Sequence, residues 1–352
     1  MHTSPKSRFR KKVLLILVCM IAAVVLINQI TVYPFIWSFR FVMSLTGQQG
    51  NPGDYDDLID TVEEVARVTV PVNGYPDASF AVYRPKKTKK ELSAVVFIHG
   101  GGWSLGNADA ISWFVKLLSS NGYVVCNVDY ALSPENTYPA STCQHAEVVN
   151  YIYEHAEEYG IDHNNIFIGG NSAGAHLSSQ LGALFTDSVY KQEMKIDTRV
   201  PREAISGLLL FNGVYNFDTA EDCCFFAFEK WAWSYTGKKE YRSYEYLDEM
   251  STVKHITSQY PSTFITVGDV DPLEPQTKEY VQKLSAEGVD HTALFWTGTG
   301  AGLNHDYIYE MNTEHGQIAY EMVLDSWKSI YGIKNKPNTQ QCIYSGISPF
   351  FL

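Results

Sequence analysis

Short apolar runs recur along this chain and alternate with segments of helical spacing. Several of the runs are continuous, which is typical of strands that are covered on both faces. Strands that alternate with helices predict a mostly parallel sheet with helices on both faces, and two β-rich runs before the alternation indicate an antiparallel start. The predicted strands span residues 67–71, 79–83, 94–98, 124–128, 166–168, 208–211, 263–267 and 292–296.

The predicted helices lie between these strands, at residues 112–120, 143–159, 173–184, 276–286 and 314–331. Residues 31–65 are expected to form a connecting and covering segment that is partly helical around 55–65. An insertion at 214–257, rich in Phe, Trp and Tyr, interrupts the alternation. It is either a helical subdomain with an aromatic core or a lid whose rings line a substrate pocket, and the pattern leaves both open.

The N-terminus follows a different pattern. Residues 1–12 carry a basic cluster, and residues 13–30 are uncharged and almost wholly apolar. As a helix, the apolar segment would be about 27 Å long, enough to cross a bilayer with little tilt. Because bulky residues follow Leu26 where a cleavage site needs small ones, we predict an uncleaved signal anchor. The basic end should stay in the cytoplasm, which places everything after residue 30 outside it.

Four aromatic residues follow the apolar segment directly. Tyr33, Phe35, Trp37 and Phe39 would suit the outer membrane interface, where aromatic rings with a polar edge settle. Alternatively, they pack on the domain that follows. The sequence predicts either environment for these rings.

The composition is that of a globular protein, with 45% hydrophobic and 19% charged residues among 352. We expect residues 66–352 to form one large α/β domain that contains the insertion. The net charge of −12 argues against a nucleic-acid partner, since no basic face is evident to meet phosphate. The oligomeric state is left open.

The chain contains six cysteines, one of them in the apolar N-terminal segment. Cys126 falls in a predicted buried strand and is expected to be a small core residue. Four others could form disulfides in an oxidising compartment, with partners that the sequence does not assign: Cys143, Cys223, Cys224 and Cys342. No spacing of Cys and His suggests a metal site, and we expect no metal.

The segment with the clearest chemistry is Gly170-Asn171-Ser172-Ala173-Gly174, which follows a predicted strand and precedes a predicted helix. A Gly-x-Ser-x-Gly in that context is the pattern of a nucleophile elbow. The glycines leave out side chains that would clash at so tight a turn. The motif alone is weak, but it makes Ser172 a candidate nucleophile for acyl transfer.

A second glycine-rich segment, His99-Gly100-Gly101-Gly102-Trp103, follows the strand at 94–98. Three glycines leave backbone N–H groups unshielded, so they can donate to a developing oxyanion. We expect this role for Gly101 and Gly102, together with the N–H of Ala173. A phosphate-binding loop is disfavoured, because no Walker lysine is present.

A general base and its acidic partner are expected late in the chain, in the order Ser…Asp…His. His305 lies in a Gly-containing loop before the last predicted helix and is the candidate base. Asp271, after the strand at 263–267, is the candidate acid, and Asp269 is its competitor. Asp271 would also suit a helix N-cap before Pro272. His145 and His176 have helical spacings and are expected in the core or on the surface.

Taken together, these motifs resemble those of the α/β-hydrolase fold, and specifically of the bacterial hormone-sensitive-lipase-like esterases. Residues 99–103 resemble the oxyanion motif of that family, 129–135 with 138–140 its Asp-Tyr-Arg-Leu-Ala-Pro-Glu…Phe-Pro-Ala stretch, 170–174 its elbow and 271–273 its acid motif. The similarity covers about 94–331. Three residues depart from the family pattern: Asn171, Ala175 and Asp306 stand where Asp, Gly and Gly are usual.

The resemblance implies a carboxylic ester hydrolase that acts on short acyl chains without a metal or organic cofactor. Ser172 would attack the ester, His305 would move the proton, and Asp271 would orient the imidazole. The partners would be a small-molecule ester and, through residues 13–30, a membrane, with the catalytic domain extracytoplasmic. Other possibilities are a sugar deacetylase or amide hydrolase with the same triad, an acyltransferase, and a catalytically inactive binding module.

Overall fold

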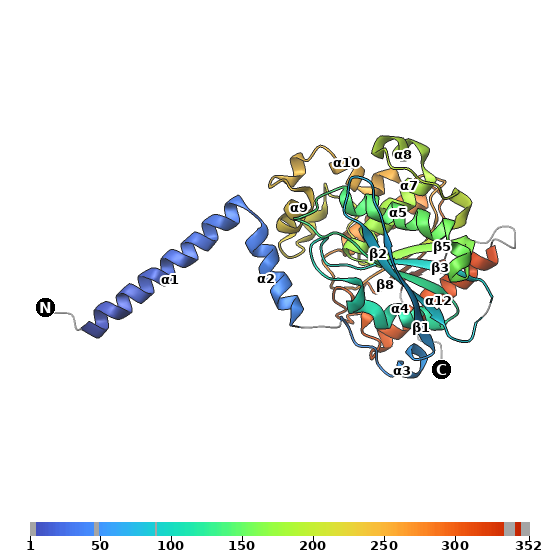
Figure 1. Ribbon diagram of the computed structural model, residues 1–352, viewed down its shortest axis with the longest axis horizontal. Helices are drawn as coiled ribbons and strands as arrows, with labels where there is room; N and C mark the ends of the chain where they lie inside the picture. Colours follow the sequence, from blue (N-terminus) through green and yellow to red (C-terminus); the bar gives the residue numbers. More distant parts are fainter. Residues whose placement is uncertain (1–4, 46–48, 89, 334–341, 346–352) are drawn as a thin grey trace.

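The computed structural model describes residues 5–45, 49–88, 90–333 and 342–345 (Figure 1). One twisted sheet runs through the domain, and its nine strands are ordered β1-β2-β4-β3-β5-β6-β7-β8-β9. β1 and β2 pair antiparallel, β2 pairs antiparallel with β4, and all later pairs are parallel. The bounds are β1 Val62–Val70, β2 Ala78–Pro85, β3 Leu92–Ile98, β4 Val124–Asp129, β5 Ile161–Asn171, β6 Ile205–Phe211, β7 Ser262–Val267, β8 His291–Phe295 and β9 Cys342–Ser345.

All eight predicted strands are present, and the predicted mostly parallel sheet with an antiparallel start is confirmed. The continuous apolar runs are buried on both faces, and every residue of β6 is buried. A ninth strand, β9, was not predicted; it follows the last helix and pairs with β8. β8 is therefore not the last strand of the described chain.

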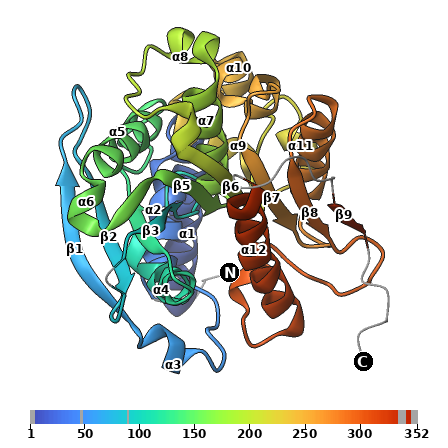
Figure 2. The same cartoon turned by 90° about the vertical axis from the view of Figure 1, so that its right-hand side faces the viewer.

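Helices cover the sheet on both sides (Figure 2). α4 (Ser112–Ser120) and α12 (Glu314–Ile333) pack into the apolar core on one face. α5 (Ala140–Glu154), α7 (Ala173–Thr186) and α11 (Glu274–Ala286) pack into the core on the other. The predicted helix at 143–159 is divided at His155 into α5 and the short α6 (Ala156–Tyr159).

The predicted partly helical segment around 55–65 contains a single helical turn, and the prediction is wrong for residues 62–65, which are strand. α3 covers only Asp56–Ile59, and β1 already begins at Val62. Val62 and Val70 at the two ends of β1 are buried, while most residues between them are exposed or half-buried. The pairing of this edge strand with β2, a long-range contact, overrides the local helical pattern.

Two helices precede the sheet. α1 (Pro5–Ile30) projects away from the domain, and α2 (Tyr33–Ser44) turns back beside it (Figure 1). Residues Lys12–Ile30 of α1 are apolar enough to cross a membrane, with a mean hydropathy of 2.8 and no burial inside the protein. Length and composition alone support such a span, and a signal sequence would have the same properties.

The insertion at 214–257 lies between β6 and β7 and folds into short helices, among them α9 (Phe228–Thr236) and α10 (Leu247–Met250). Several of its rings are buried in the core, including Tyr215, Phe217 and Tyr235. α8 (Ser188–Met194) lies nearby, after α7. The buried rings of the insertion belong to the core that the sheet shares with α5, α7 and α11, so the insertion packs on the domain and its aromatic core is not separate.

Candidate active site

Ser172 occupies a tight turn between β5 and α7. Its φ of 54° and ψ of −118° lie outside the regions that side chains other than glycine usually adopt. A Cβ on either Gly170 or Gly174 would collide with the carbonyl oxygen of Ile98 on the neighbouring strand. This geometry is that of the predicted elbow, and it explains why both flanking positions are glycine.

Ser172 faces a cavity of about 370 Å³, which lies within the range of small-molecule sites, about 300–1,000 Å³. The cavity is lined by residues from α2, the glycine-rich loop, the elbow, the insertion and the loop after β8. His305 lines the same cavity, but it forms no hydrogen bond with Ser172 within the described chain. The lining also includes Phe39, Met43, Gly101, Gly102, Ala173, Phe225, Phe226, Trp231 and Asp306.

His305 is held by Asp271. Its Nδ1 lies 2.8 Å from Oδ2 of Asp271, whose side chain is fully buried. Burial by itself would raise the pKa of Asp271, but hydrogen bonds from His305, Asn212 and the Leu273 N–H hold it below its ordinary value. Asp271 is therefore an ionised, buried carboxylate directed at the imidazole, which is the arrangement an orienting acid needs.

Asp269, the competing acid, has a different position. Its Oδ1 accepts from the N–H of Leu303 at 2.6 Å, and its Oδ2 accepts from the N–H of Gly302 at 3.2 Å. These bonds fasten the loop that carries His305 to the end of β7. Asp269 thus supports the loop, and Asp271 contacts the ring. The helix N-cap role considered for Asp271 is wrong, because Leu273 is the N-cap of α11; Asp271 accepts instead from the N–H of Leu273 at 2.8 Å.

Asn212 was missed by the sequence analysis. It follows β6 with a φ of 55°, and its Nδ2 donates to Oδ2 of Asp271 at 2.6 Å. The Asn212-Gly213 pair after an apolar run was a signal for a turn that tolerates positive φ. Nothing in the local sequence indicated that this turn meets Asp271, because the two residues come from different strand ends.

The glycine-rich loop presents its backbone to the cavity. Gly101 and Gly102 have φ values of 117° and 56°, and a Cβ at Gly101 would collide with the carbonyl oxygen of Leu105. The N–H of Gly100 is already used, since it donates to Oδ1 of Asn171 at 2.9 Å. The N–H groups of Gly101 and Gly102 have no acceptor in the described chain, and Ala173 opens α7, where N–H groups lack an intrahelical partner.

Two of the departures from the family pattern contact one another. Nδ2 of Asn171 donates to Oδ1 of Asp306 at 3.0 Å, and Gln49 donates to Oδ2 of Asp306 at 2.9 Å. Asp306 adopts a φ of 62°, and its Oδ2 lies 3.9 Å from Nε2 of His305. Burial would lower the pKa of His305, but the carboxylates of Asp306 and Asp271 outweigh it and raise the pKa to about 9.

This charge predicts a pH effect. Below pH 9 the resting imidazole holds a proton, so kcat/KM for an ester should rise as the pH approaches about 9. Asp306→Asn removes one of the two carboxylates, and the acid limb of the profile should therefore move to lower pH. Asp325→Asn, an exposed carboxylate on α12, is the control and should leave the profile in place. If the acid limb of the Asp306→Asn profile stayed in place, the conclusion that Asp306 raises the pKa of His305 would be contradicted.

The remaining candidates have structural positions. His145 and His176 are fully buried, and burial lowers the pKa of each, to about 3 and about 4. Cys126 is buried in β4 as expected. Cys143, Cys223 and Cys224 are free thiols in this structure, and the side chain of Cys342 lies outside the described residues. Within the described ranges, no group of three His, Cys, Asp or Glu side chains could hold a metal.

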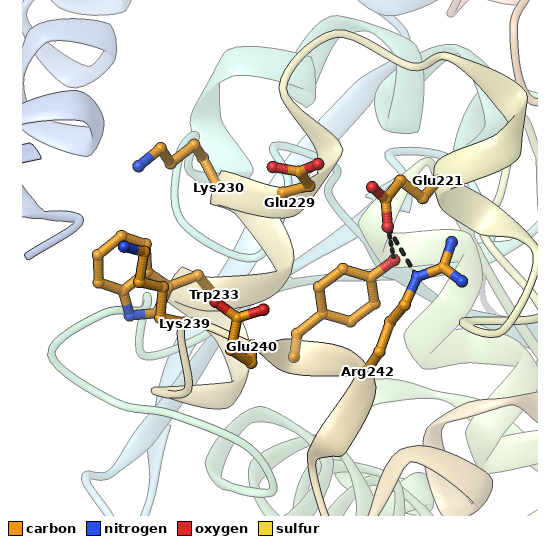
Figure 3. A pocket seen from close by; sticks show the side chains of 8 residues that line it. Glu221, Glu229, Lys230, Trp233, Lys239, Glu240 and Arg242 are labelled. Atoms are coloured by element: carbon orange, nitrogen blue, oxygen red, sulfur yellow. Dashed lines mark hydrogen bonds and ion pairs between the residues drawn. The ribbon is translucent and has the colours of Figure 1, made fainter. Parts of the chain in front are cut away.

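A second cavity, of about 310 Å³, lies on the insertion (Figure 3). Its lining is charged, and Glu221 accepts hydrogen bonds there from Tyr241 and Arg242. It has no serine, cysteine or histidine that could act as nucleophile or base. The cavity at Ser172 is therefore the candidate active site.

The doubly covered parallel sheet and the strand–turn–helix at Ser172 define an α/β-hydrolase. A family model described as BD-FAE matches residues 80–284, more than half of the chain, and the chain belongs to that family. The predicted resemblance to α/β-hydrolase esterases is confirmed.

Three relatives illustrate this similarity. An esterase of Gibberella moniliformis is 25% identical over 267 residues, covering 70% of this chain and 80% of that protein. An acetyl esterase of Salmonella paratyphi B is 26% identical over 239 residues, covering 64% and 69%. The structure of an esterase from Pyrobaculum calidifontis superposes with a TM-score of 0.66 at 20% identity, covering 84% of this chain and 93% of that one.

Proposed function

We propose that this protein hydrolyses carboxylic esters with short acyl groups, through an acyl-enzyme formed on Ser172. Its class, carboxylic ester hydrolase, is that of its esterase relatives. The observation that carries the mechanism is that Ser172, on its strained turn, lines one cavity with His305, whose Nδ1 lies 2.8 Å from the buried carboxylate of Asp271. Fold alone would not assign the chemistry, because hydrolase folds serve several functions.

In this mechanism, the Oγ of Ser172 attacks the ester carbonyl while Nε2 of His305 takes the hydroxyl proton. Asp271 keeps the proton of Nδ1 in place and stabilises the imidazolium. The tetrahedral oxyanion accepts from the N–H groups of Gly101, Gly102 and Ala173. His305 then gives its proton to the leaving alcohol, and water, activated by His305, releases the acid from Ser172.

Ser172 and His305 line the same cavity but share no hydrogen bond in the described chain, and the mechanism requires that this bond form when substrate binds. Catalytic hydrogen bonds are often long in the absence of substrate and tighten when it binds. The oxyanion donors have an energetic role as well, since loss of one such donor costs about 3 kcal/mol of barrier, on the order of a hundredfold in rate. Gly101, Gly102 and Ala173 all line the cavity, which supports this role for their N–H groups.

The insertion at 214–257 acts as the lid of this site in our proposal. Phe225, Phe226 and Trp231 line the cavity, and the ring of Phe225 lies 5.1 Å from that of His305. Such rings exclude water from the reacting ester and supply an apolar wall. We also propose that α1 anchors the protein, with residues 1–12 in the cytoplasm and the catalytic domain outside it.

The short-acyl preference and the anchor are tested together. Membranes from cells that express the full chain, washed with alkaline carbonate, should hydrolyse p-nitrophenyl acetate and butyrate. Hydrolysis of the dodecanoate should be slower by about tenfold or more, because a pocket that a short acyl group already fills discriminates against extra methylenes. Membranes that lack the chain give the background. Equal rates across acyl lengths would contradict the preference, and activity lost to the wash would contradict the anchor.

A further inference from the structure

α2 is clamped to the domain by one of its faces. Ile36 is fully buried, and the rings of Phe35 and Phe39 lie 4.9 and 5.2 Å from that of Trp231. On the same side, Arg40 donates two 2.8 Å hydrogen bonds to the carboxylate of Glu135. These contacts fix the rotation of α2 about its axis, so another side of the helix is held away from the domain.

A second side of α2, which begins at Trp37 beside the contact with Glu135, is apolar and exposed. Trp37, Phe41 and Leu45 are spaced four residues apart, which places them in one stripe along the helix and its C-cap. They are 57%, 67% and 72% exposed. Phe226, in the lid, is 68% exposed, and its ring lies 6.1 Å from that of Phe39. Several large apolar side chains exposed on one short helix and the neighbouring lid mark an interaction site.

The exposed surface borders the active-site cavity. Met43 and Phe226 are exposed, and both also line the cavity with Ser172. Met43 is four residues from Phe39, which lines the cavity too, so both lie on the side of α2 that faces the domain. Exposed apolar side chains of α2 and the lid therefore lie at the edge of the cavity, beside the exposed stripe of the same helix.

The occupant of this surface is indicated by what adjoins it. Only two residues separate α2 from the end of the apolar helix α1. Lys230 donates to the carbonyl oxygen of Asn28 at 2.8 Å, so the last turn of α1 is held against the lid. The ammonium groups of Lys230 and Lys239 lie 4.6 and 5.8 Å from the ring centre of Trp233 (Figure 3). Basic and aromatic side chains at the end of a span are suited to phospholipid headgroups.

We propose that the stripe Trp37, Phe41 and Leu45, with Phe226, docks in the surface of a phospholipid bilayer, and that the active site takes its substrate from that bilayer. The substrate class is then an ester that joins a short acyl group to an amphiphilic alcohol. This inference rests on the proposed ester hydrolysis and on the anchor, and it adds the location of the substrate.

Hydrolysis of such an ester needs no co-reactant other than water. A bond forms between Oγ of Ser172 and the acyl carbon as the bond from that carbon to the alcohol oxygen breaks. The proton of Ser172 passes through His305 to the alcohol, which stays in the lipid. Water then cleaves the acyl-enzyme, so the short acid leaves on the aqueous side and the hydroxyl of Ser172 is restored.

Tryptophan fluorescence tests the docking directly. The chain has seven tryptophans, and apart from Trp37 none is more than 8% exposed. The full chain is reconstituted into phosphatidylcholine–phosphatidylglycerol vesicles with or without brominated acyl chains. Brominated lipid should quench a component of the fluorescence that the Trp37→Phe variant lacks. Equal spectra in both lipids would overturn the proposal. A stripe covered by a second copy of the chain would give this same result, because Trp37 would then be kept away from the lipid.

Activity in the same vesicles tests the substrate class. We compare the triple variant Trp37→Gln, Phe41→Gln, Leu45→Gln with a control, Val189→Gln with Leu58→Gln, whose exposed residues lie on α8 and α3. Acetate release from bilayer-held hexadecyl acetate should fall about tenfold in the triple variant only, while p-nitrophenyl acetate is hydrolysed normally by all. Unchanged release from hexadecyl acetate would overturn the inference alone. Loss of p-nitrophenyl acetate hydrolysis in the wild type would instead overturn the proposed function.

Discussion

Ser172→Ala is expected to reduce the hydrolysis of p-nitrophenyl acetate to background, a loss of about 10⁴-fold or more in kcat. The substitution removes the oxygen that forms the acyl bond and leaves the cavity and the oxyanion donors in place. Alanine keeps the Cβ of serine, so the turn at φ 54° carries the same strain and the fold should be retained. Initial rates measured against enzyme-free controls give the loss, and a thermal melt verifies folding.

Ser178→Ala is the matched control for this change. Ser178 lies on the same helix, is fully buried, and its hydroxyl has no hydrogen-bond partner within the described chain. Its replacement should leave turnover within about twofold of the wild type, as for substitutions that leave no unsatisfied group. Substantial turnover by a folded Ser172→Ala variant would remove Ser172 from the mechanism.

Asp271→Asn is expected to lower kcat by about 10⁴-fold while the fold is retained. A neutral amide cannot hold the proton on Nδ1 of His305, and it does not stabilise the imidazolium that forms when the nucleophile is deprotonated. Asn212 already donates to Oδ2 of Asp271, so an amide that turned its NH₂ group toward Asn212 would also lose that bond. The measurement is kcat with a saturating soluble ester.

Asp269→Asn separates the two neighbouring carboxylates. Within the described residues, Asp269 accepts from backbone and threonine donors around the His305 loop, and an amide oxygen can replace one of its two acceptors. We expect a loss of about tenfold, from looser placement of the imidazole. If Asp269→Asn were the more damaging change, the acid would have been assigned to the wrong residue.

The sheet was predictable because its strands are covered on both faces. Runs such as 94–98 and 208–211 are continuously apolar, and burial on both sides demands that pattern. The elbow at Ser172 was predictable for a similar reason, since a turn that excludes Cβ atoms on both sides requires glycine at 170 and 174. Such features can be predicted from the sequence because they depend on burial and on steric contacts that only certain residue types satisfy.

Contacts between distant segments could not be predicted in this way. Gln49 and Asn171 meet Asp306 from opposite parts of the chain, and no local pattern records their approach. The division of roles between Asp269 and Asp271 likewise depends on which carboxylate faces His305 in space. β1 was placed too late because its pairing with β2, and not its own periodicity, decides its start.

The aromatic residues after α1 illustrate the same limit. Two environments were predicted for them, the membrane interface or the domain, and the structure shows packing on the domain for only some of the rings. Phe35 and Phe39 pack on Trp231, while Trp37 is exposed on another side of α2. The helical rotation that separates them follows from the contacts of Ile36 and Arg40 with the domain.

The central claim is that Ser172 is a nucleophile activated by His305 and Asp271. The most direct measurement is the site of attack on a fluorophosphonate probe, located by mass spectrometry of the digested full chain. We predict a single phosphonylated serine in the peptide that contains residue 172, with labelling greatly slowed in His305→Ala. A wild-type chain that is folded and remains unlabelled, or one labelled at another serine, would contradict the account.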